Sequence, residues 1–211
     1  VPPFEVSVFA DPSGAFTTAA GMVALTEKYL RDQFDSNLNG SNVIILGGTG
    51  PVGVASAVIC AKAGSNVTLV GRNIEKAEKI ASICNERYQS KNIKGGADAD
   101  KSDYFKTADV VLNTGAAGIQ LMTDDHISTS SSLKICADTN AVPPSGIAGV
   151  DVMDNGKAIE KSPNGCVGIG ALAIGNIKYK SQHECLKLMY TSEKPVYLDF
   201  EDAFKFAQKS V

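Results

Sequence analysis

The segment from Gly48 to Gly53 carries the most specific chemistry in the sequence. It reads Gly48-Thr49-Gly50-Pro51-Val52-Gly53, which matches the pattern G-x-G-x-x-G and follows the apolar run 43–46. Glycines at these positions permit a tight turn and let the backbone approach a pyrophosphate, whose charge the N-terminus of the next helix stabilises. The pattern predicts a dinucleotide site. The alternative is a turn that only packs a helix closely against a strand.

Arg72 follows the next apolar run, 67–70, and lies nineteen residues after Gly53. In chains that bind NAD, this place commonly holds an acid for the ribose 2′-hydroxyl. A guanidinium would bind a 2′-phosphate through charge-assisted hydrogen bonds, whereas a carboxylate would repel it. Arg72 therefore favours NADP over NAD, with Asn73 and Lys76 as supporting residues. A solvated surface arginine is the alternative.

Two further strand ends carry candidate site residues. Thr114, Gly115 and Ala116 open a glycine-rich turn after the run 109–113, and Asp138 and Asn140 end the run 133–138. Ligands of parallel sheets bind at the carboxyl ends of the strands. We therefore expect the first loop to border the cofactor, and Asp138 and Asn140 to contact the nicotinamide or the substrate. Capping and turn roles are the alternative for these two residues.

The hydrophobic pattern indicates the elements that must position these residues. Apolar runs predict strands at 43–46, 67–70, 92–95, 109–113, 133–138 and 167–169. Helical spacing predicts helices at 51–63, 75–88, 101–108, 175–190 and 199–208, the last with Asp199 as its N-cap. Strands that alternate with helices through short glycine-rich loops predict an α/β fold with a doubly wound parallel sheet, Rossmann-like in type.

The first forty residues differ from this repeat. They predict a strand at 6–9, a turn at 11–14 and a long helix at 15–34 that is rich in Ala and Thr at its start. We expect residues 1–40 to be a lead-in strand, turn and helix from a substrate lobe. Residues 41–211 are then expected to form the NADP-binding domain with its C-terminal helices.

The composition excludes several classes of protein. The chain has 211 residues, 44% hydrophobic and 20% charged, with a net charge of -3. This balance predicts a globular chain with a real core, and it offers no positive field for nucleic acid or an anionic membrane. We expect a cytoplasmic protein, because the sequence has no apolar segment long enough to span a membrane and no signal peptide. Enzymes of this kind frequently self-associate, so a homo-oligomer is expected.

Metal and nucleophilic catalysis have little support in the sequence. It has two histidines and five widely spaced cysteines with no CxxC pattern, which predicts reduced thiols and no metal site. No Ser/His/Asp or Cys/His arrangement is evident. Asp98 and Asp100 are interpreted as caps or solvated charges.

Five segments, in order along nearly the whole chain, are similar to motifs of one enzyme family. The segment 11–21 (DPSGAFTTAAG) resembles D-x-N-G-x-x-T-T-A-A-A of the methylene-tetrahydromethanopterin dehydrogenases of methylotrophs. The loop 47–53 resembles that family's G-T-G-P-V-G loop, and 70–72 its C-G-R strand end. The segment 137–147 (ADTNAVPPSGI) resembles A-D-Y-N-A-x-P-P-x-G-I, and 168–178 (GIGALAIGNIK) resembles G-A-L-G-I-G-G-L-K. Pro12, Ser13, Phe16 and Thr139 depart from the family's commoner residues.

The resemblance implies an oxidoreductase that transfers a hydride from methylene-tetrahydromethanopterin, or methylene-tetrahydrofolate, to NADP in formaldehyde oxidation. It also implies that Lys178 acts at the site and that Asp11, Ser13, Thr17 and Thr18 border a pterin substrate. A helix-surface lysine is the alternative for Lys178. Members of this family carry a further N-terminal lobe that helps to form the pterin cleft, and this sequence starts just before the Asp11 segment.

Two other functions fit parts of the sequence. One is a dinucleotide-binding module or fragment without its own catalysis, which the absence of the upstream lobe would explain. The other is a shikimate-dehydrogenase-like oxidoreductase, suggested by Gly71-Arg72-Asn73 after the second strand, although no Lys/Asp catalytic pair is visible.

Overall fold

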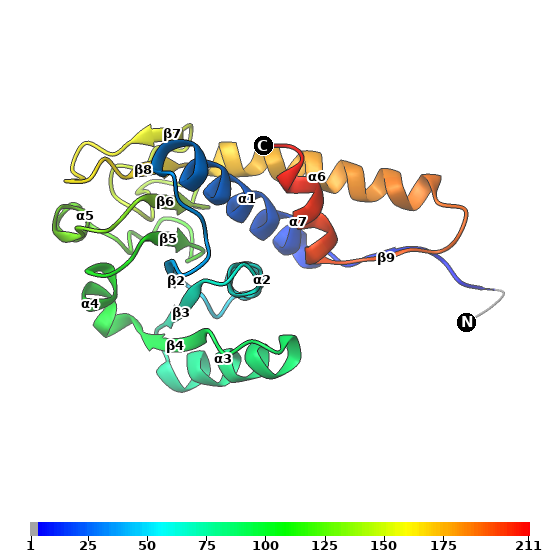
Figure 1. The fold of residues 1–211 in the computed structure, drawn as a ribbon, viewed down its shortest axis with the longest axis horizontal. Helices are drawn as coiled ribbons and strands as arrows, with labels where there is room; N and C mark the ends of the chain where they lie inside the picture. Colours follow the sequence, from blue (N-terminus) through cyan, green and yellow to red (C-terminus); the bar gives the residue numbers. More distant parts are fainter. Residues whose placement is uncertain (1–3) are drawn as a thin grey trace.

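A seven-stranded sheet forms the centre of the computed structural model, which describes residues 4–211 (Figure 1). Its strand order is β4-β3-β2-β5-β6-β8-β7, and every neighbouring pair is parallel except β7 with β8. The strands are β2 (Asn42–Leu46), β3 (Asn66–Gly71), β4 (Ile93–Ala97), β5 (Val110–Asn113), β6 (Ile135–Asp138), β7 (Asn155–Ala158) and β8 (Val167–Ile169). The order reverses between β2 and β5, as in a doubly wound sheet, so the predicted fold class is confirmed.

Both faces of this sheet are buried. Val43 and Ile45 of β2 belong to one apolar cluster, and the alternate residues Ile44 and Leu46 belong to another. The first cluster holds residues of helices α1 (Ala15–Phe34), α2 (Pro51–Lys62), α3 (Ile74–Tyr88), α6 (Ala171–Thr191) and α7 (Phe200–Gln208). The second holds residues of α4 (Lys101–Phe105) and α5 (Asp124–Thr129). Continuous apolar runs such as 43–46 are therefore what a sheet covered on both sides requires.

Helix α1 belongs to the same core as the sheet. Ala19, Ala20 and Met22 are completely buried in it. At Gly21, a Cβ would lie 2.9 Å from the Ile174 carbonyl oxygen, so the small residues of α1 let it cross α6 closely. The predicted division of the chain at residue 40 stays a prediction, and the helix before that point packs on the sheet that follows it.

Most predicted elements agree with the structure to within a few residues, and three findings differ. Helix α6 begins at Ala171, before the predicted 175, because the chain continues in helix through Gly175, where a Cβ would have open space. The edge strand β7 was not predicted, since its residues Asn155-Gly156-Lys157-Ala158 have no apolar alternation. The short strand β9 (Tyr197–Leu198), which pairs with β1 (Val8–Phe9), was not predicted either. Asp199 caps α7 as expected.

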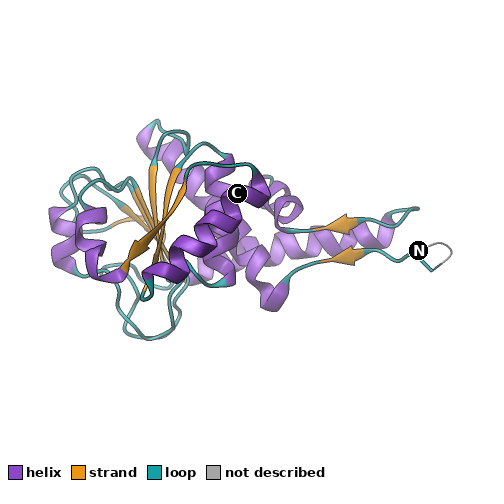
Figure 2. Cartoon of the chain, turned by 90° about the horizontal axis from the view of Figure 1, so that it is seen from below, coloured by secondary structure: helices purple, strands orange, loops and turns teal. Residues whose placement is uncertain are grey.

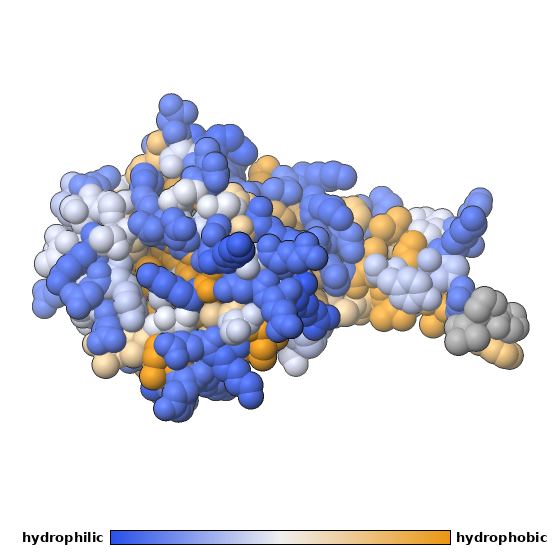
Figure 3. All heavy atoms as spheres, turned by 60° about the horizontal axis from the view of Figure 1, so that its bottom comes forward, coloured by the Kyte–Doolittle hydropathy of each residue, from blue (hydrophilic) through white to orange (hydrophobic). Residues whose placement is uncertain are grey.

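The strands β1 and β9 extend away from the main sheet beside the end of α6 (Figure 2). Apolar side chains are exposed on this extension, among them Val8, Leu186, Tyr190 and Tyr197. Orange atoms mark apolar surface on this part of the space-filling view (Figure 3). Within residues 4–211, no helix is both long and apolar enough to cross a membrane.

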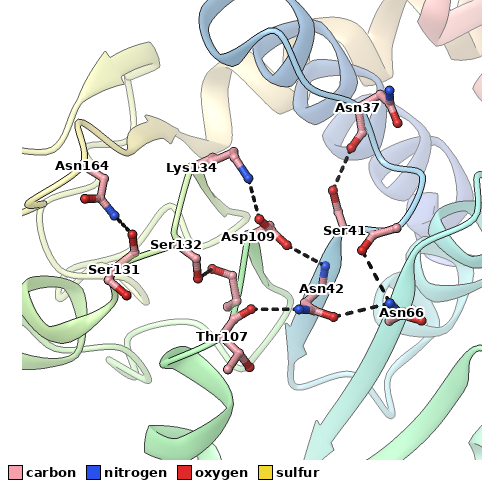
Figure 4. A network of polar contacts seen from close by, with 12 residues as sticks. Asn37, Ser41, Asn42, Asn66, Thr107, Asp109, Ser131, Ser132, Lys134 and Asn164 are labelled. Carbon is pink, nitrogen blue, oxygen red and sulfur yellow. Dashed lines mark hydrogen bonds and ion pairs between the residues drawn. The ribbon is translucent and has the colours of Figure 1, made fainter.

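A polar network holds the amino ends of the central strands together (Figure 4). Asp109, just before β5, accepts a hydrogen bond from the Asn42 backbone N–H at 2.9 Å and forms an ion pair with Lys134. The Asn42 side chain donates to the Thr107 carbonyl at 3.0 Å. Hydrogen bonds and an ion pair within the chain therefore join the amino ends of these strands. The predicted site lies at their carboxyl ends.

Candidate functional site

The carboxyl ends of four neighbouring strands bring the predicted site loops together. Leu46 of β2 pairs with Val70 of β3 on one side and with Asn113 of β5 on the other, and Asn113 pairs with Asp138 of β6. A cavity of about 580 Å³ lies at this edge. Its lining residues are Gly47, Thr49, Gly50, Val70, Gly71, Arg72, Asp98, Lys101, Thr114, Gly115, Ala116, Ile119, Gln120 and Leu121.

Two glycines of the G-x-G-x-x-G motif are required by the packing of the protein itself. A Cβ at Gly53 would lie 2.6 Å from the Gly48 Cα, and a Cβ at Gly48 would lie 2.8 Å from the Ile45 carbonyl oxygen. These contacts hold the start of α2 against β2. Gly47 has a left-handed backbone conformation, at φ 67°. A Cβ on this residue would collide with the Gly115 backbone.

Gly50 differs from the other motif glycines. A Cβ there would meet only the Gly47 carbonyl oxygen, at 3.6 Å, which is an ordinary van der Waals distance. Its φ of -85° is open to any residue. Nothing in the described chain requires a glycine at this position, which lines the cavity and precedes the uncapped N-terminus of α2. A phosphate group that comes close to the backbone at this position would require a glycine. The site therefore fits the pyrophosphate of a dinucleotide.

The remaining residues of the motif have simpler places. Thr49 lines the cavity, Pro51 is the exposed first residue of α2, and Val52 packs against the main core. Pro at the first helical position has no backbone N–H to leave unpaired.

Arg72 lies where the sequence predicts, at the end of β3 and on the wall of the cavity. Its neighbour Asn73 has another task, because its side chain accepts the Lys76 backbone N–H at 2.6 Å and caps α3. Two charged residues that the sequence analysis did not assign to the site, Asp98 and Lys101, line the same cavity. Their position directly after β4 could have indicated a role at the site. The two glycines in that strand made it difficult to recognise as a strand from the sequence.

Asp138 organises the loop that follows β6. One carboxylate oxygen accepts from the Asn113 side chain at 2.7 Å and from the Asn140 backbone at 2.9 Å, and the other accepts from the backbone N–H groups of Gly146 and Ile147. The Asn140 side chain accepts from Gly118 and donates to the Pro144 carbonyl. The turn roles of both residues are therefore observed, and their predicted contacts with cofactor or substrate stay predictions. Asn113, which the sequence analysis did not single out, positions Asp138 and accepts from the Gly115 backbone.

Lys178 and the segment from Asp11 form a second corner at the start of α1. A Cβ at Gly14 would lie 2.5 Å from Lys178 Nζ, so the ammonium group rests on the turn before α1. Gly14 has φ 71°, which glycine adopts without strain. The ammonium of Lys178 takes part in no hydrogen bond or ion pair with residues 4–211. It is half-buried on α6, and its role at the site stays a prediction beside the alternative of a helix-surface lysine.

The polar residues of the Asp11 segment hold the same turn. Asp11 accepts the backbone N–H groups of Phe16 and Thr17 and the Thr17 hydroxyl, the last at 2.7 Å. The Thr18 hydroxyl donates to the Gly14 carbonyl at 2.6 Å. Ser13 is exposed, at φ 53°, and projects from this turn. The structure thus brings Lys178 to the residues that the sequence resemblance places at the substrate, which no spacing in the sequence indicates.

The thiols are unsuited to nucleophilic catalysis. All five cysteines are free and buried. Burial raises the pKa of Cys185 to about 12 and also raises that of Cys84, while a hydrogen bond to Cys166, followed by burial, raises the pKa of Cys136. A thiol with a raised pKa is a weak nucleophile at neutral pH. Among residues 4–211, no group of three or more His, Cys, Asp or Glu side chains is arranged to hold a metal ion.

Comparison with curated proteins identifies the family. The chain is 40% identical over 210 residues to the NAD(P)-dependent methylenetetrahydromethanopterin dehydrogenase of Methylorubrum extorquens, and it covers 70% of that protein. The chain belongs to the methylenetetrahydromethanopterin dehydrogenase family. A second relative from the same organism, described as bifunctional protein MdtA, is 36% identical over 210 residues, and the chain covers 69% of it. No family model matches the chain.

Solved structures agree on the fold of this family member. Quinate dehydrogenase from Corynebacterium glutamicum in complex with NAD matches the whole chain with a TM-score of 0.59 at 14% identity, over 76% of its own length. Shikimate 5-dehydrogenase from Listeria monocytogenes matches 97% of the chain, over 75% of its own, with a TM-score of 0.57 at 13% identity. At such identities the likeness shows the fold alone, so it does not favour shikimate chemistry.

Proposed function

We propose that this chain transfers a hydride from methylene-tetrahydromethanopterin, or from methylene-tetrahydrofolate, to NADP in one-carbon metabolism. The observation that carries the proposal is the 40% identity to a named methylenetetrahydromethanopterin dehydrogenase over 98% of the chain. The cavity supports the cofactor half of the reaction, because Gly50 leaves room for a pyrophosphate and Arg72 supplies a cation for a 2′-phosphate.

The chemistry requires little acid or base catalysis. A methylene group between two nitrogens can release hydride directly, since the resulting cation is delocalised over both nitrogens. NADP, when bound, supplies the hydride acceptor at its nicotinamide ring. The protein has to hold the two reactants in contact and exclude water, so catalysis consists of positioning and electrostatics. This explains why neither the buried thiols nor the two histidines are needed at the site.

The cofactor contacts follow from the walls of the cavity. We assign Gly48, Thr49, Gly50, Pro51, Val52 and Gly53 to the pyrophosphate, and Thr114, Gly115 and Ala116 to the opposite wall. Arg72 binds the 2′-phosphate, and Asn73 supports it by fixing the start of α3. Asp138 and Asn140 shape the loop beside the nicotinamide half.

The Gly14 corner is the proposed substrate side. Lys178 contacts the pterin carrier there through its ammonium group, which has no hydrogen bond or ion pair with residues 4–211. Ser13 reaches the substrate from the exposed side of the turn. Asp11, Thr17 and Thr18 hold the turn in place. We further expect a homo-oligomer in the cytoplasm, with no nucleic-acid or membrane partner.

Hydride transfer can be tested directly. The purified protein is mixed with NADP and either methylene carrier, and the appearance of reduced-nicotinamide absorbance is followed. We expect reduction with at least one of the two carriers and none when the carrier is omitted. The proposal fails if a preparation that binds NADP reduces none with either carrier. Gly50→Val serves as the matched variant, because its side chain would fill the space reserved for the pyrophosphate.

A further inference from the structure

Arg72 and Asp98 are neighbours at the ends of adjacent strands. Gly71 of β3 pairs with Ala97 of β4, and the next residue of each chain segment is Arg72 or Asp98. Both line the 580 Å³ cavity. A carboxylate therefore lies on the same wall as the cation that is proposed to bind a 2′-phosphate.

Lys101 holds this carboxylate. Its Nζ lies 3.1 Å from one Asp98 carboxylate oxygen and 3.3 Å from the other. The Lys101 side chain is only 20% exposed and that of Asp98 is 35% exposed, so the pair is more sheltered than most ion pairs of this chain. Arg72 is exposed and forms no ion pair with residues 4–211. Within residues 4–211, the cavity wall thus carries Arg72 without an ion pair and the Asp98–Lys101 pair, whose charges neutralise each other.

We propose that the Asp98–Lys101 pair sets the preference between NADP and NAD. The inference rests on the proposed use of NADP and adds the residues that decide the choice. Lys101 neutralises Asp98, so that Arg72 can hold a dianionic 2′-phosphate beside it. Asp98 without its lysine would repel that phosphate and would instead accept a hydrogen bond from the ribose hydroxyl of NAD.

The physical basis is the distance dependence of charge repulsion. A carboxylate within about 7 Å of a phosphate dianion, at the edge of a protein, weakens binding by roughly tenfold or more. NAD has no phosphate at this position, so the same carboxylate leaves its affinity unchanged or improves it. Removal of Lys101 must therefore lower the ratio of NADP affinity to NAD affinity, which loss of structure alone would not do.

A matched control lies at the end of the same helix, where Lys106 directly follows α4. Lys106 forms an ion pair with Asp103 at the same i,i+3 spacing, with 65% and 74% of the side chains exposed. Neither residue lines the cavity. A change at Lys106 removes a lysine and an ion pair from the end of α4 without changing the charge on the cavity wall.

The test measures equilibrium binding of NADP and of NAD, each separately, by calorimetry. The proteins are the wild type, Lys101→Met, Asp98→Asn, the double variant and the control Lys106→Met. We expect Lys101→Met to weaken NADP about tenfold while NAD binds as well or better. The double variant should recover most of the NADP affinity, because the repelling charge is gone. Lys106→Met should bind both cofactors like the wild type.

Three results would overturn the inference. An unchanged NADP-to-NAD affinity ratio in Lys101→Met would show that the pair does not affect selection. Equally weak NADP binding by Lys101→Met and the double variant would show that the lysine binds the phosphate itself and that Asp98 has no part. A wild-type protein that binds neither cofactor would overturn the proposed function as well. The unfolding temperature of each variant shows whether a loss of binding comes from a loss of folding.

Discussion

Two corners of this protein are built in different ways. The cofactor corner is the cavity lined by Gly50 and Arg72, where NADP is proposed to bind, and the Gly14 corner is the turn on which Lys178 rests. The first draws its residues from neighbouring strand ends of one sheet, and its glycine motif is the continuous segment Gly48 to Gly53. The second brings Lys178 of α6 onto Gly14, although the two are 164 residues apart (178 minus 14). A site built on one turn can be read from a motif, whereas a site built by two crossing helices depends on how closely they pack.

The largest effect is expected where the cofactor corner is part of the core. Gly53→Ala places a Cβ 2.6 Å from the Gly48 Cα, so the helix and strand must separate, at a cost of roughly 3 kcal/mol in the free energy of unfolding. Gly50→Ala has room for its methyl group and should unfold like the wild type, yet bind NADP at least tenfold more weakly. Thermal unfolding and calorimetry distinguish the two. If Gly50→Ala also unfolds early, the glycine has a structural role that the geometry does not show.

Arg72→Ala tests which part of the cofactor the same corner binds. The change removes a charge-assisted contact to the 2′-phosphate, which is worth about 1.5 to 3 kcal/mol of NADP binding, and leaves the NAD contacts in place. Separate titrations with NADP and NAD measure the difference. Equal losses for both cofactors would contradict the assigned role. Lys79→Ala, at an exposed position farther along α3 that does not line the cavity, is the control and should change either affinity little.

Lys178→Ala probes the Gly14 corner. We expect turnover of the methylene carrier to fall about tenfold, as for the loss of one charge-assisted contact, while NADP affinity is unchanged. Lys187→Ala, an exposed position farther along α6, should keep full turnover. A parallel loss of NADP affinity in Lys178→Ala would mean that the two corners are not separate. Gly14→Ala should lower turnover as well, since its Cβ would displace the ammonium group and its φ of 71° strains any residue but glycine.

The smallest expected effect is a pH dependence near the cofactor corner. Burial, followed by the charge of Lys101, lowers the pKa of His126 from 6.5. Its Nδ1 accepts the Thr123 backbone N–H at 3.1 Å, in a capping box at the start of α5, and its Nε2 lies 3.0 Å from the Ser102 hydroxyl on α4. The folded state prefers the neutral ring, so this stabilisation is present above pH 6.5 and is lost as the pH falls through the lower folded pKa.

His126→Gln can test this dependence, because glutamine at the same helical position can bond the N-cap backbone without titrating. The unfolding temperature of the wild type should fall more than that of the variant between about pH 7.5 and about pH 5.5. Identical falls would show that the ring does not contribute.

Sequence reasoning was most successful where local pattern and tertiary packing demand the same thing. The apolar run 43–46 had to be a strand buried on both faces, and Gly48 and Gly53 had to be glycines for the helix to pack against it. Reasoning of this kind missed Asp98 and Lys101, because the strand before them contains Gly95 and Gly96. These glycines are required by the close approach of α3 and Tyr104, which no neighbouring residue in the sequence reveals.

Local sequence was enough to predict the order of the main strands and helices, the glycine loop after β2 and the cation at the end of β3, because each depends on residues close together in the chain. The tertiary structure decided which distant residues share a corner. Gly21 lets α1 cross α6 within contact distance, and this crossing places the Lys178 ammonium on Gly14. Strand register likewise sets Asp98 beside Arg72. Contacts of this kind depend on packing distances between separate elements, and local sequence does not specify those distances.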